Sequence, residues 1–453
     1  MSMRPRRFAV FVLLLTLTTV ASVSAATPAK ESSSFAPINY RHRTLANGLE
    51  VYSIEDHATP TVAINVWYRV GSKNDPEGRS GFAHLFEHIM FKATAHMKSE
   101  MLDRLTEDVG GMNNAYTHPD RTVYYEEVPS NYLQTLLWAE GERMGSLTVD
   151  EANFKSERDV VKEEFRFRIL APSYGRLGYA ITKDSYAVHP YRRPGIGSIE
   201  ELDAATLADV QAFHASYYRP DNAVLIVAGD LDPKQFDAWV DRYLGTVAKP
   251  STEIPRVTAN EPARTAEKQF TEHGANVPLP AVALTWLIPK ARSDDSEPLE
   301  LASTILSEGD SSRLYQSLVY KKQLAQSATA NAETREETGL FTARAVMASG
   351  KKTEDGIAAL REEIAALAAK PVSAEELDKA KNLVITSSLR ERETNGGKAG
   401  ALGEAITQYH DADYVNRGLA RLQAVTAADV QRVVKKYLIE AKAVVITYTS
   451  EAK

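Results

Sequence analysis

The chain has 453 residues, which is more than one hydrophobic core usually organises, so at least two domains or two packed halves are expected. Its 53 Lys+Arg residues against 60 Asp+Glu residues give a net charge of −7 at pH 7, which provides no basic face for nucleic acid. The sequence contains no cysteine, so a disulfide framework and a lipid-modified cysteine are both excluded.

The N-terminal segment has the pattern of a secretory signal peptide. Basic residues at positions 4, 6 and 7 precede an apolar run from Phe8 to Val20, and small residues follow as far as Ala26. We expect residues 1–25 to be removed by cleavage after Ala25, with an uncleaved membrane anchor as the alternative. Since no second apolar run is long enough to cross a bilayer, the mature protein is predicted to have no stable membrane span and to be periplasmic or secreted.

A metal-binding pattern follows Thr61–Val70, a β-branched stretch that predicts a strand. The pattern is His84-x-x-Glu87-His88, and on a helix these three side chains share one face. Two neutral imidazoles four residues apart can bind one zinc ion, and the carboxylate of Glu87 can accept a proton from a zinc-bound water. The alternative, a surface helix with two solvated histidines, is disfavoured by the apolar residues within and after the motif.

A catalytic zinc needs a third protein ligand and an open position for water. The best downstream candidates are Glu157 and Glu164, which lie seven residues apart in a charged helix and therefore on one face. Carboxylates on such a helix are usually only solvated, so the spacing alone leaves the third ligand open.

A sequence repeat divides the chain, because residues 202–228 match residues 422–448 at a constant offset of 220. Each copy predicts a helix that begins with a Thr N-cap and an Asp three residues later, followed by a β-branched strand. The matched residues of the first copy are Leu202, Ala204, Thr206, Asp209, Val210, Gln211, Tyr217, Ala223, Val224 and Ile226.

The repeat predicts two homologous halves, residues 36–247 and 262–453, joined by a polar, aperiodic linker at 248–261. Each half mixes strands with amphipathic helices, which favours an α+β architecture with helices packed on one face of a sheet. The segment Glu297–Gly309 corresponds by order to the predicted zinc helix but contains no histidine. One zinc ion per chain is therefore predicted, in the first half.

Taken together, the motifs resemble the pitrilysin/insulinase family of inverted zincins, in particular its short bacterial members and the zinc-bearing beta subunit of mitochondrial processing peptidase. The resemblance covers essentially the whole mature chain. It rests on the His-Leu-Phe-Glu-His segment, on GGMNNAYT at 110–117, on TVYY at 122–125, on the Glu-Arg-x-Val-Val-x-x-Glu segment at 157–164 and on HPY at 189–191.

This resemblance implies that Glu164 is the third zinc ligand and Glu157 a supporting carboxylate near the site. It also implies that α/β units enclose a chamber for peptides, and that a peptide substrate adds a strand to a sheet edge near the zinc. Here the substrate-binding residues would be Asn114, Ala115 and Tyr116. The alternative for Asn114 is a turn-forming role in a glycine-rich turn.

The second half departs from the family in one respect. In the family that the chain resembles, single-chain members and some partner subunits carry an Arg and a Tyr seven residues apart in their C-terminal unit, which help to hold the substrate and stabilise the oxyanion. The matching stretch here has Val319 and Gln326 at these positions. Arg313 and Tyr320 offer an alternative register. We expect a related subunit to supply the Arg/Tyr pair in a heterodimer or heterotetramer; the alternative function is a catalytically weak peptide-binding or scaffold subunit.

Overall fold

The first sheet has six strands in the order β1-β2-β6-β3-β5-β4. The computed structural model describes residues 35–451, so the predicted signal peptide at 1–25 lies outside the described residues. Residues from Pro37 onward form one compact unit. The strands are β1 (Arg41–Thr44), β2 (Glu50–Glu55), β3 (Thr61–Tyr68), β4 (Met112–Thr117), β5 (Thr122–Pro129) and β6 (Ala223–Gly229).

The second sheet repeats this topology with five strands in the order β7-β11-β8-β10-β9. In each sheet one parallel pair, β2 with β6 and β7 with β11, is followed by antiparallel pairs. The strands are β7 (Lys268–Gly274), β8 (Ala281–Ile288), β9 (Ala325–Glu333), β10 (Gly339–Met347) and β11 (Val444–Ser450).

The two copies of the sequence repeat occupy equivalent places in the two sheets. Thr206 and Asp209 form a capping box at the start of α7 (Leu207–Tyr217), and Thr426 and Asp429 form one at the start of α14 (Ala427–Val434). These helices lead into β6 and β11, which occupy equivalent interior positions. The prediction of an α+β protein with two similar halves is confirmed, while the exact boundaries at 247 and 262 stay a prediction.

Helices connect the strands in both halves, and 3₁₀ or π turns extend several of them. In the first half the α-helices are α1 (Phe82–Ile89), α2 (Met101–Glu107), α3 (Leu133–Ser146), α4 (Glu151–Phe165), α5 (Gly175–Ser185), α6 (Ile199–Ala204), α7 and α8 (Pro233–Tyr243). In the second half they are α9 (Ser296–Ser307), α10 (Thr353–Ala369), α11 (Ala374–Glu391), α12 (Asn395–Gln408), α13 (Tyr414–Ala424) and α14. Among residues 35–451, no helix is both long enough and apolar enough to cross a membrane.

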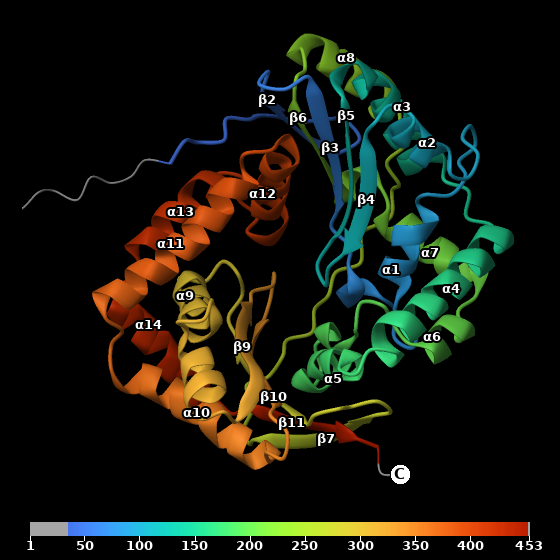
Figure 1. Ribbon diagram of the computed structural model, residues 1–453. Coiled ribbons are helices and arrows are strands. Elements are labelled where there is room, and N and C mark those ends of the chain that lie inside the picture. The colour runs from blue at the N-terminus through green and yellow to red at the C-terminus, as the bar shows by residue number, and fades with distance from the viewer. Residues whose placement is uncertain (1–34, 452–453) are drawn as a thin grey trace, which may run out of the picture. The chain divides into compact units, whose positions relative to one another are not determined.

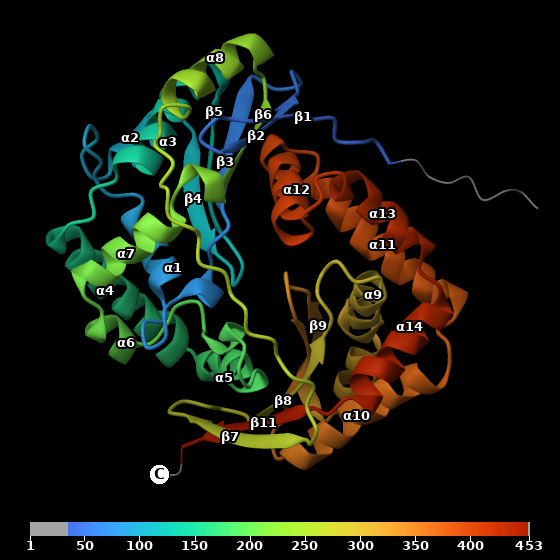
Figure 2. The ribbon, with the colours of Figure 1, turned by 180° about the vertical axis from the view of Figure 1, so that it is seen from behind.

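One helix from each half packs on the sheet of the other half. Helix α12 of the second half packs on β3 and β6, where Leu402 and Ile406 join a core that includes Trp67 and Ile226 (Figures 1 and 2). Helix α5 of the first half packs on the second sheet, against β7, β8 and β11. Both faces of the interior strand β6 are covered as a result, which explains why every residue of that strand is buried.

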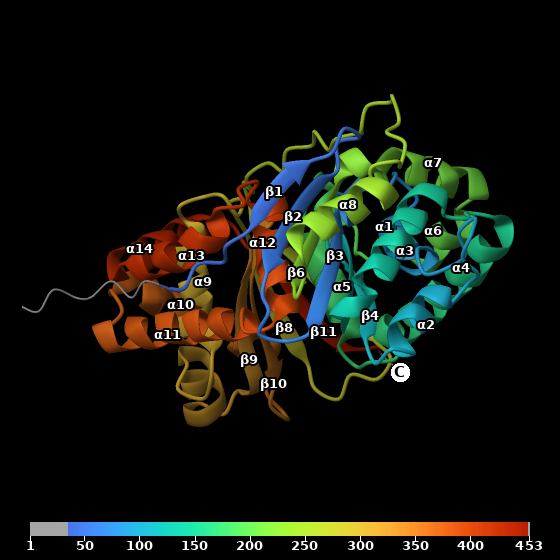
Figure 3. The same cartoon turned by 90° about the horizontal axis from the view of Figure 1, so that it is seen from above.

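The opposite face of the first sheet carries the helices that hold the candidate site. Helices α1, α3, α7 and α8 contribute to the large core on this face, and the view from above shows them on the side away from the second half (Figure 3). Strand β4 forms the edge of this sheet and contacts α1. A helix and an unpaired strand edge therefore meet at one place.

Candidate metal centre

Helix α1 buries its apolar face in the core, and its polar face is turned to the site. Phe82, Leu85, Phe86 and Ile89 are fully buried, because they recur at intervals of three and four residues and face the core. The remaining face carries the residues of the predicted zinc motif. The hydroxyl of Tyr124 donates a hydrogen bond of 2.9 Å to the carbonyl oxygen of Phe86, which fixes the helix against β5.

The start of α1 depends on Asp75 and on a glycine. The backbone amides of Gly81 and Ala83 donate to the buried carboxylate of Asp75 at 2.7 and 2.9 Å, so Asp75 satisfies two amides at the helix N-terminus. Gly81 has φ +94°, and a Cβ there would lie 2.9 Å from the carbonyl oxygen of Ile196. Only glycine fits this junction without strain.

Helix α4 supplies the carboxylates. Asp150 caps its N-terminus by accepting from the amide of Asn153, and Phe154, Val161 and Phe165 bury its inner face. Glu157 and Glu164 lie on the side of α4 that meets α1, since contacts to both histidines come from these two residues. The seven-residue spacing thus places both on one face, as predicted.

The structure brings three side chains of the predicted metal site together. An oxygen of Glu164, Oε2, lies 3.2 Å from Nε2 of His88 and 3.6 Å from Nε2 of His84. One ligand atom from each of the three residues lies within 4.8 Å of the others. Among residues 35–451 this is the one group of three or more His, Cys, Asp or Glu side chains with such geometry. Oε2 of Glu87 lies 4.0 Å from Nε2 of His84, at the border of the group.

The protonation states of His84 and Glu164 favour the binding of a cation. Burial, and next the charge of His88, lower the pKa of His84 to about 4, so this imidazole is neutral at pH 7. Burial acts to raise the pKa of Glu164, but the hydrogen bond to His88 and the charge of Arg168 act against it, and the pKa is held below its usual value. Glu87 is different, because burial raises its pKa despite a hydrogen bond from Thr117.

These residues fit a zinc ion by chemistry and by spacing. Two imidazoles and one carboxylate are a common donor set for catalytic zinc. In a tetrahedral shell with ligands about 2.0–2.2 Å from zinc, two donor atoms lie about 3.3–3.6 Å apart. The observed separations of 3.2 and 3.6 Å from Glu164 to the two histidines match that value closely.

Glu157 lies behind the group and is almost completely buried. Its Oε2 is 3.8 Å from Nδ1 of His88, and its Oε1 accepts from Ser156 at 3.0 Å and pairs with Lys92 at 3.0 Å. This position, beside the ring nitrogen that faces away from Glu164, is where a carboxylate would orient a metal-binding histidine.

The predicted substrate residues lie on β4, the edge strand. Asn114 and Tyr116 are exposed and Ala115 is buried, and the strand runs without a break from Met112 to Thr117. The turn-forming alternative for Asn114 is therefore wrong. Tyr116 lines a cavity of about 1540 Å³ that continues along the second half, past β9 and helices α9, α11, α12 and α13.

Among the described residues, neither Arg313 nor Tyr320 of the alternative register forms a hydrogen bond or ion pair with the zinc-motif residues. Arg313 forms two hydrogen bonds of 2.7 Å to the carboxylate of Glu376 in α11. Tyr320 is 67% exposed, and neither residue lines the cavity that reaches β4. Gln326, at the position where the family pattern has Tyr, is exposed on β9.

The comparisons with known proteins decide the family. A family model described as Insulinase (Peptidase family M16) matches residues 50–168, and one described as Peptidase M16 inactive domain matches residues 204–384. The zinc protease PqqE of Helicobacter pylori is 31% identical over 400 residues, which cover 87% of this chain and 89% of that protein. The chain belongs to the insulinase family of peptidases. The resemblance stated from the motifs is confirmed.

Other members of the insulinase family are similar along most of the chain. A probable mitochondrial-processing peptidase subunit beta of Arabidopsis thaliana is 25% identical over 408 residues, 88% of this chain and 76% of that protein. The crystal structure of a protease from Helicobacter pylori superposes with a TM-score of 0.86 at 29% identity and covers 91% of this chain and 99% of that one. The first half of the periplasmic protease PqqL from Escherichia coli, with a TM-score of 0.73 and 20% identity over 91% of this chain and 92% of that one, shares the fold.

Two contacts in this insulinase-family site were not predicted from the sequence. Arg168 pairs with Oε1 of Glu164 at 2.9 Å, and Thr117 donates to Glu87 at 2.6 Å. The contact of Arg168 with Glu164 could have been predicted from the sequence, because an Arg four residues after a Glu on a helix lies on the same face. Thr117 belongs to the GGMNNAYT segment, but its contact crosses from a strand to a helix, and no local spacing indicates such a contact.

Proposed function

We propose that this chain is the zinc-bearing subunit of a peptidase, with His84, His88 and Glu164 as metal ligands and Glu87 as general base. The observation that carries the proposal is the convergence of the three ligand atoms beside Glu87, next to the unpaired edge of β4. Relatives named zinc proteases support the identity of the metal.

In this proposal the chain's own residues move the proton. A bound zinc ion would supply a Lewis acid that polarises the scissile carbonyl and makes water acidic enough to react near neutral pH. Glu87 would accept a proton from the attacking water and deliver it to the leaving amine. Glu157 would hold the ring of His88 from behind, so that its other nitrogen faces the metal.

The edge strand β4 would hold the substrate. An extended peptide can add to a free sheet edge by main-chain hydrogen bonds, and such pairing selects extended chains more than particular sequences. Asn114, Ala115 and Tyr116 are the residues of β4 that would contact it, and the cavity beyond Tyr116 has room for the rest of a peptide. Peptides and unfolded polypeptides are the proposed substrates.

A related subunit would complete the active site. Val319 has no hydrogen-bond donor in its side chain, and Arg313 is engaged by Glu376, so neither register provides the expected pair. Loss of one oxyanion donor typically costs about 100- to 1000-fold in rate. A partner that carries Arg and Tyr, in a heterodimer or heterotetramer, would restore this contribution.

The test is zinc analysis together with hydrolysis of an internally quenched peptide. We expect about one zinc ion per chain, and we expect Glu87→Gln to keep the metal while it abolishes hydrolysis. A wild-type protein that purifies without zinc and cannot be loaded would refute the metal site. Equal hydrolysis by wild type and Glu87→Gln would refute the mechanism.

The partner is tested by mixing. We expect weak hydrolysis by the chain alone and a gain of about 100-fold or more with the related subunit. The same rate with and without that subunit contradicts the proposal of a shared active site.

A second candidate function, a non-catalytic peptide-binding or scaffold subunit, is favoured by one observation. The family model that matches residues 204–384 is described as an inactive domain. Those residues lie mostly in the half without the zinc motif, whereas the four residues of that motif are all present in the first half. This candidate predicts peptide binding without turnover, and Glu87→Gln would then change nothing.

We propose a periplasmic or secreted location, supported by the signal-peptide pattern at 1–25. Cell fractionation of a tagged full-length protein tests it. Recovery of the uncleaved chain from the cytoplasm would contradict it.

A further inference from the structure

We propose that Thr117 is the residue that positions the general base, by holding one carboxylate oxygen of Glu87 from the end of the substrate strand. The inference rests on the proposed function, because it takes Glu87 as the base. It adds a positioning residue that acts through Glu87 and does not itself touch the reacting atoms.

The contact is direct and its geometry is good. Oγ1 of Thr117 donates to Oε2 of Glu87 at 2.6 Å, a distance typical of a charge-assisted hydrogen bond between a hydroxyl and a carboxylate. Oε2 also lies 4.0 Å from Nε2 of His84. A carboxylate oxygen can accept two hydrogen bonds, so Oε2 can be held by Thr117 and still take the proton of the attacking water.

The backbone of Thr117 is itself fixed. Thr117 is the last residue of β4 and pairs with Thr122 of β5, and the amide of His118 donates to the carbonyl of Arg121 at 2.8 Å to close the hairpin. Thr122 is fully buried and its hydroxyl donates to the carbonyl of Val70 at 2.8 Å. A β-branched side chain on such a backbone has few rotamers, so its hydroxyl has a defined direction.

The position on β4 links the base to substrate binding. Residues 114–116 of the strand are those that would pair with the peptide, and Thr117 follows them directly. A peptide added to this edge would stiffen the strand and, with it, the hydroxyl that holds Glu87. Helix α1 carries Glu87 and β4 carries Thr117, so the hydrogen bond also sets the distance between the two elements at the site.

The experiment compares Thr117→Val, which keeps the shape and removes the hydroxyl, with Thr117→Ser, which keeps the hydroxyl. Thr285→Val is the matched control, because it removes a buried hydroxyl from β8, a strand of the second sheet that carries none of the proposed active-site residues. Hydrolysis of a quenched peptide gives kcat and KM, zinc titration gives the metal affinity, and crystal structures of the zinc-loaded variants give the orientation of Glu87.

We expect Thr117→Val to lower kcat by about 10- to 100-fold with KM and zinc affinity within about twofold of wild type. Thr117→Ser should stay within about threefold, and Thr285→Val should lose stability but keep kcat. In crystals, Glu87 should keep its orientation in Thr117→Ser and turn away from residue 117 in Thr117→Val.

Unchanged kcat and unchanged Glu87 orientation in Thr117→Val would overturn the proposal. So would a parallel loss of zinc affinity, which indicates a general structural role, or an equal defect in Thr117→Ser. If wild type and Glu87→Gln hydrolyse peptide equally, the proposed function fails, and the crystal structures still decide whether Thr117 orients Glu87.

Discussion

The ammonium nitrogen of Lys73 lies 2.9 Å from Oδ1 of Asp120, with both side chains almost completely buried. Lys73 also pairs with Glu336, which belongs to the turn between β9 and β10 of the second half. The backbone amide of Glu336 donates to the other oxygen of Asp120 at 3.0 Å, and the hydroxyl of Tyr191 donates to Oδ1. A turn of the second half is thereby anchored in a buried charged cluster of the first.

Replacement of this lysine should therefore destabilise the protein strongly. We expect Lys73→Met to lower the free energy of unfolding by about 3–5 kcal/mol, because it leaves the buried carboxylate of Asp120 without its cation. Urea unfolding followed by tryptophan fluorescence measures the effect. Lys322→Met is the control: its partner Glu362 is 66% exposed, and loss of that surface pair should cost less than about 1 kcal/mol. Equal effects of the two variants would contradict the role assigned to the cluster.

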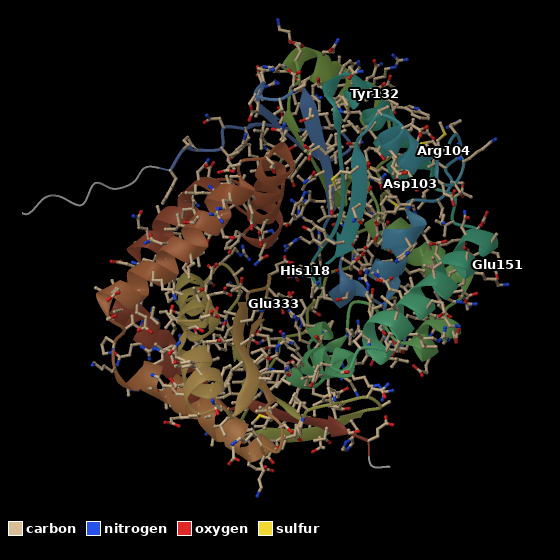
Figure 4. The ribbon with its side chains drawn as sticks, viewed as in Figure 1. Asp103, Arg104, His118, Tyr132, Glu151 and Glu333 are labelled. Carbon is tan, nitrogen blue, oxygen red and sulfur yellow. The ribbon has the colours of Figure 1, made fainter. Side chains whose placement is uncertain are left out.

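His118 makes the same region sensitive to acid. Burial, and next the charge of Arg121, lower the pKa of His118 to about 3, and the amide of Asp120 donates to its Nδ1 at 3.3 Å. Glu333 lies 4.0 Å from Nε2, and the two side chains lie close together between the halves (Figure 4). The charged groups that act on this imidazole are Arg121, Asp120, Arg335, Lys73 and Glu333.

The lowered pKa of His118 means that acid destabilises the folded protein relative to the unfolded chain. The unfolded chain takes up a proton near pH 6.5 and the folded protein does not, so the contribution of His118 is fully present above that pH and is lost toward pH 3. Between pH 7.5 and pH 5 this amounts to about 1–2 kcal/mol. His118→Gln should reduce the acid-induced loss of stability by this amount, as measured by urea midpoints at both pH values. An identical pH dependence in both proteins would show that the imidazole titrates normally.

Local patterns predicted the parts of the site that depend on local geometry. His84, Glu87 and His88 share a face because helical periodicity is fixed by the backbone. The capping boxes at Thr206 and Thr426 likewise predicted the starts of two helices.

The remaining contacts depend on how elements pack. Glu164 reaches the histidines only because α4 lies against α1, and the sequence alone left it one of two candidates until the family pattern was considered. Lys73 and Glu336 are 263 residues apart, and no local signal connects them. The packing of α5 on the second sheet and of α12 on the first was not predicted. The amphipathic pattern of each helix shows that one face is buried, but it does not show against which sheet.

Removal of the proposed third ligand should weaken zinc binding without unfolding the protein. We expect Glu164→Gln to weaken zinc binding by more than about 100-fold, because even residues behind the ligands are worth 10- to 100-fold. Glu163→Gln is the matched control on the same helix, since the Glu163 side chain is 74% exposed and pairs with the surface residue Arg166. Competition with a chromophoric chelator gives both affinities. Similar zinc affinities for the two variants would remove Glu164 from the ligand set.

The contact between α12 and Trp67 decides how firmly the second half is joined to the sheet that carries the site. A Cβ at Gly403 would lie 2.1–2.5 Å from three atoms of the Trp67 indole ring, whereas a Cβ at Gly400, one turn earlier on the same helix, would meet nothing within 4 Å. Gly400→Ala should be neutral or stabilise by up to about 1 kcal/mol, because alanine favours the helix.

Gly403→Ala should instead destabilise by about 1–3 kcal/mol despite the same gain in helix propensity, because the helix must move off the sheet. Urea unfolding measures both variants, and the intrinsic fluorescence, to which Trp67 contributes, should change only in Gly403→Ala. Because α12 also lines the cavity that reaches β4, a displaced helix should raise KM for long peptides more than for short ones. Equal stability of the two variants would show that α12 does not pack tightly on Trp67.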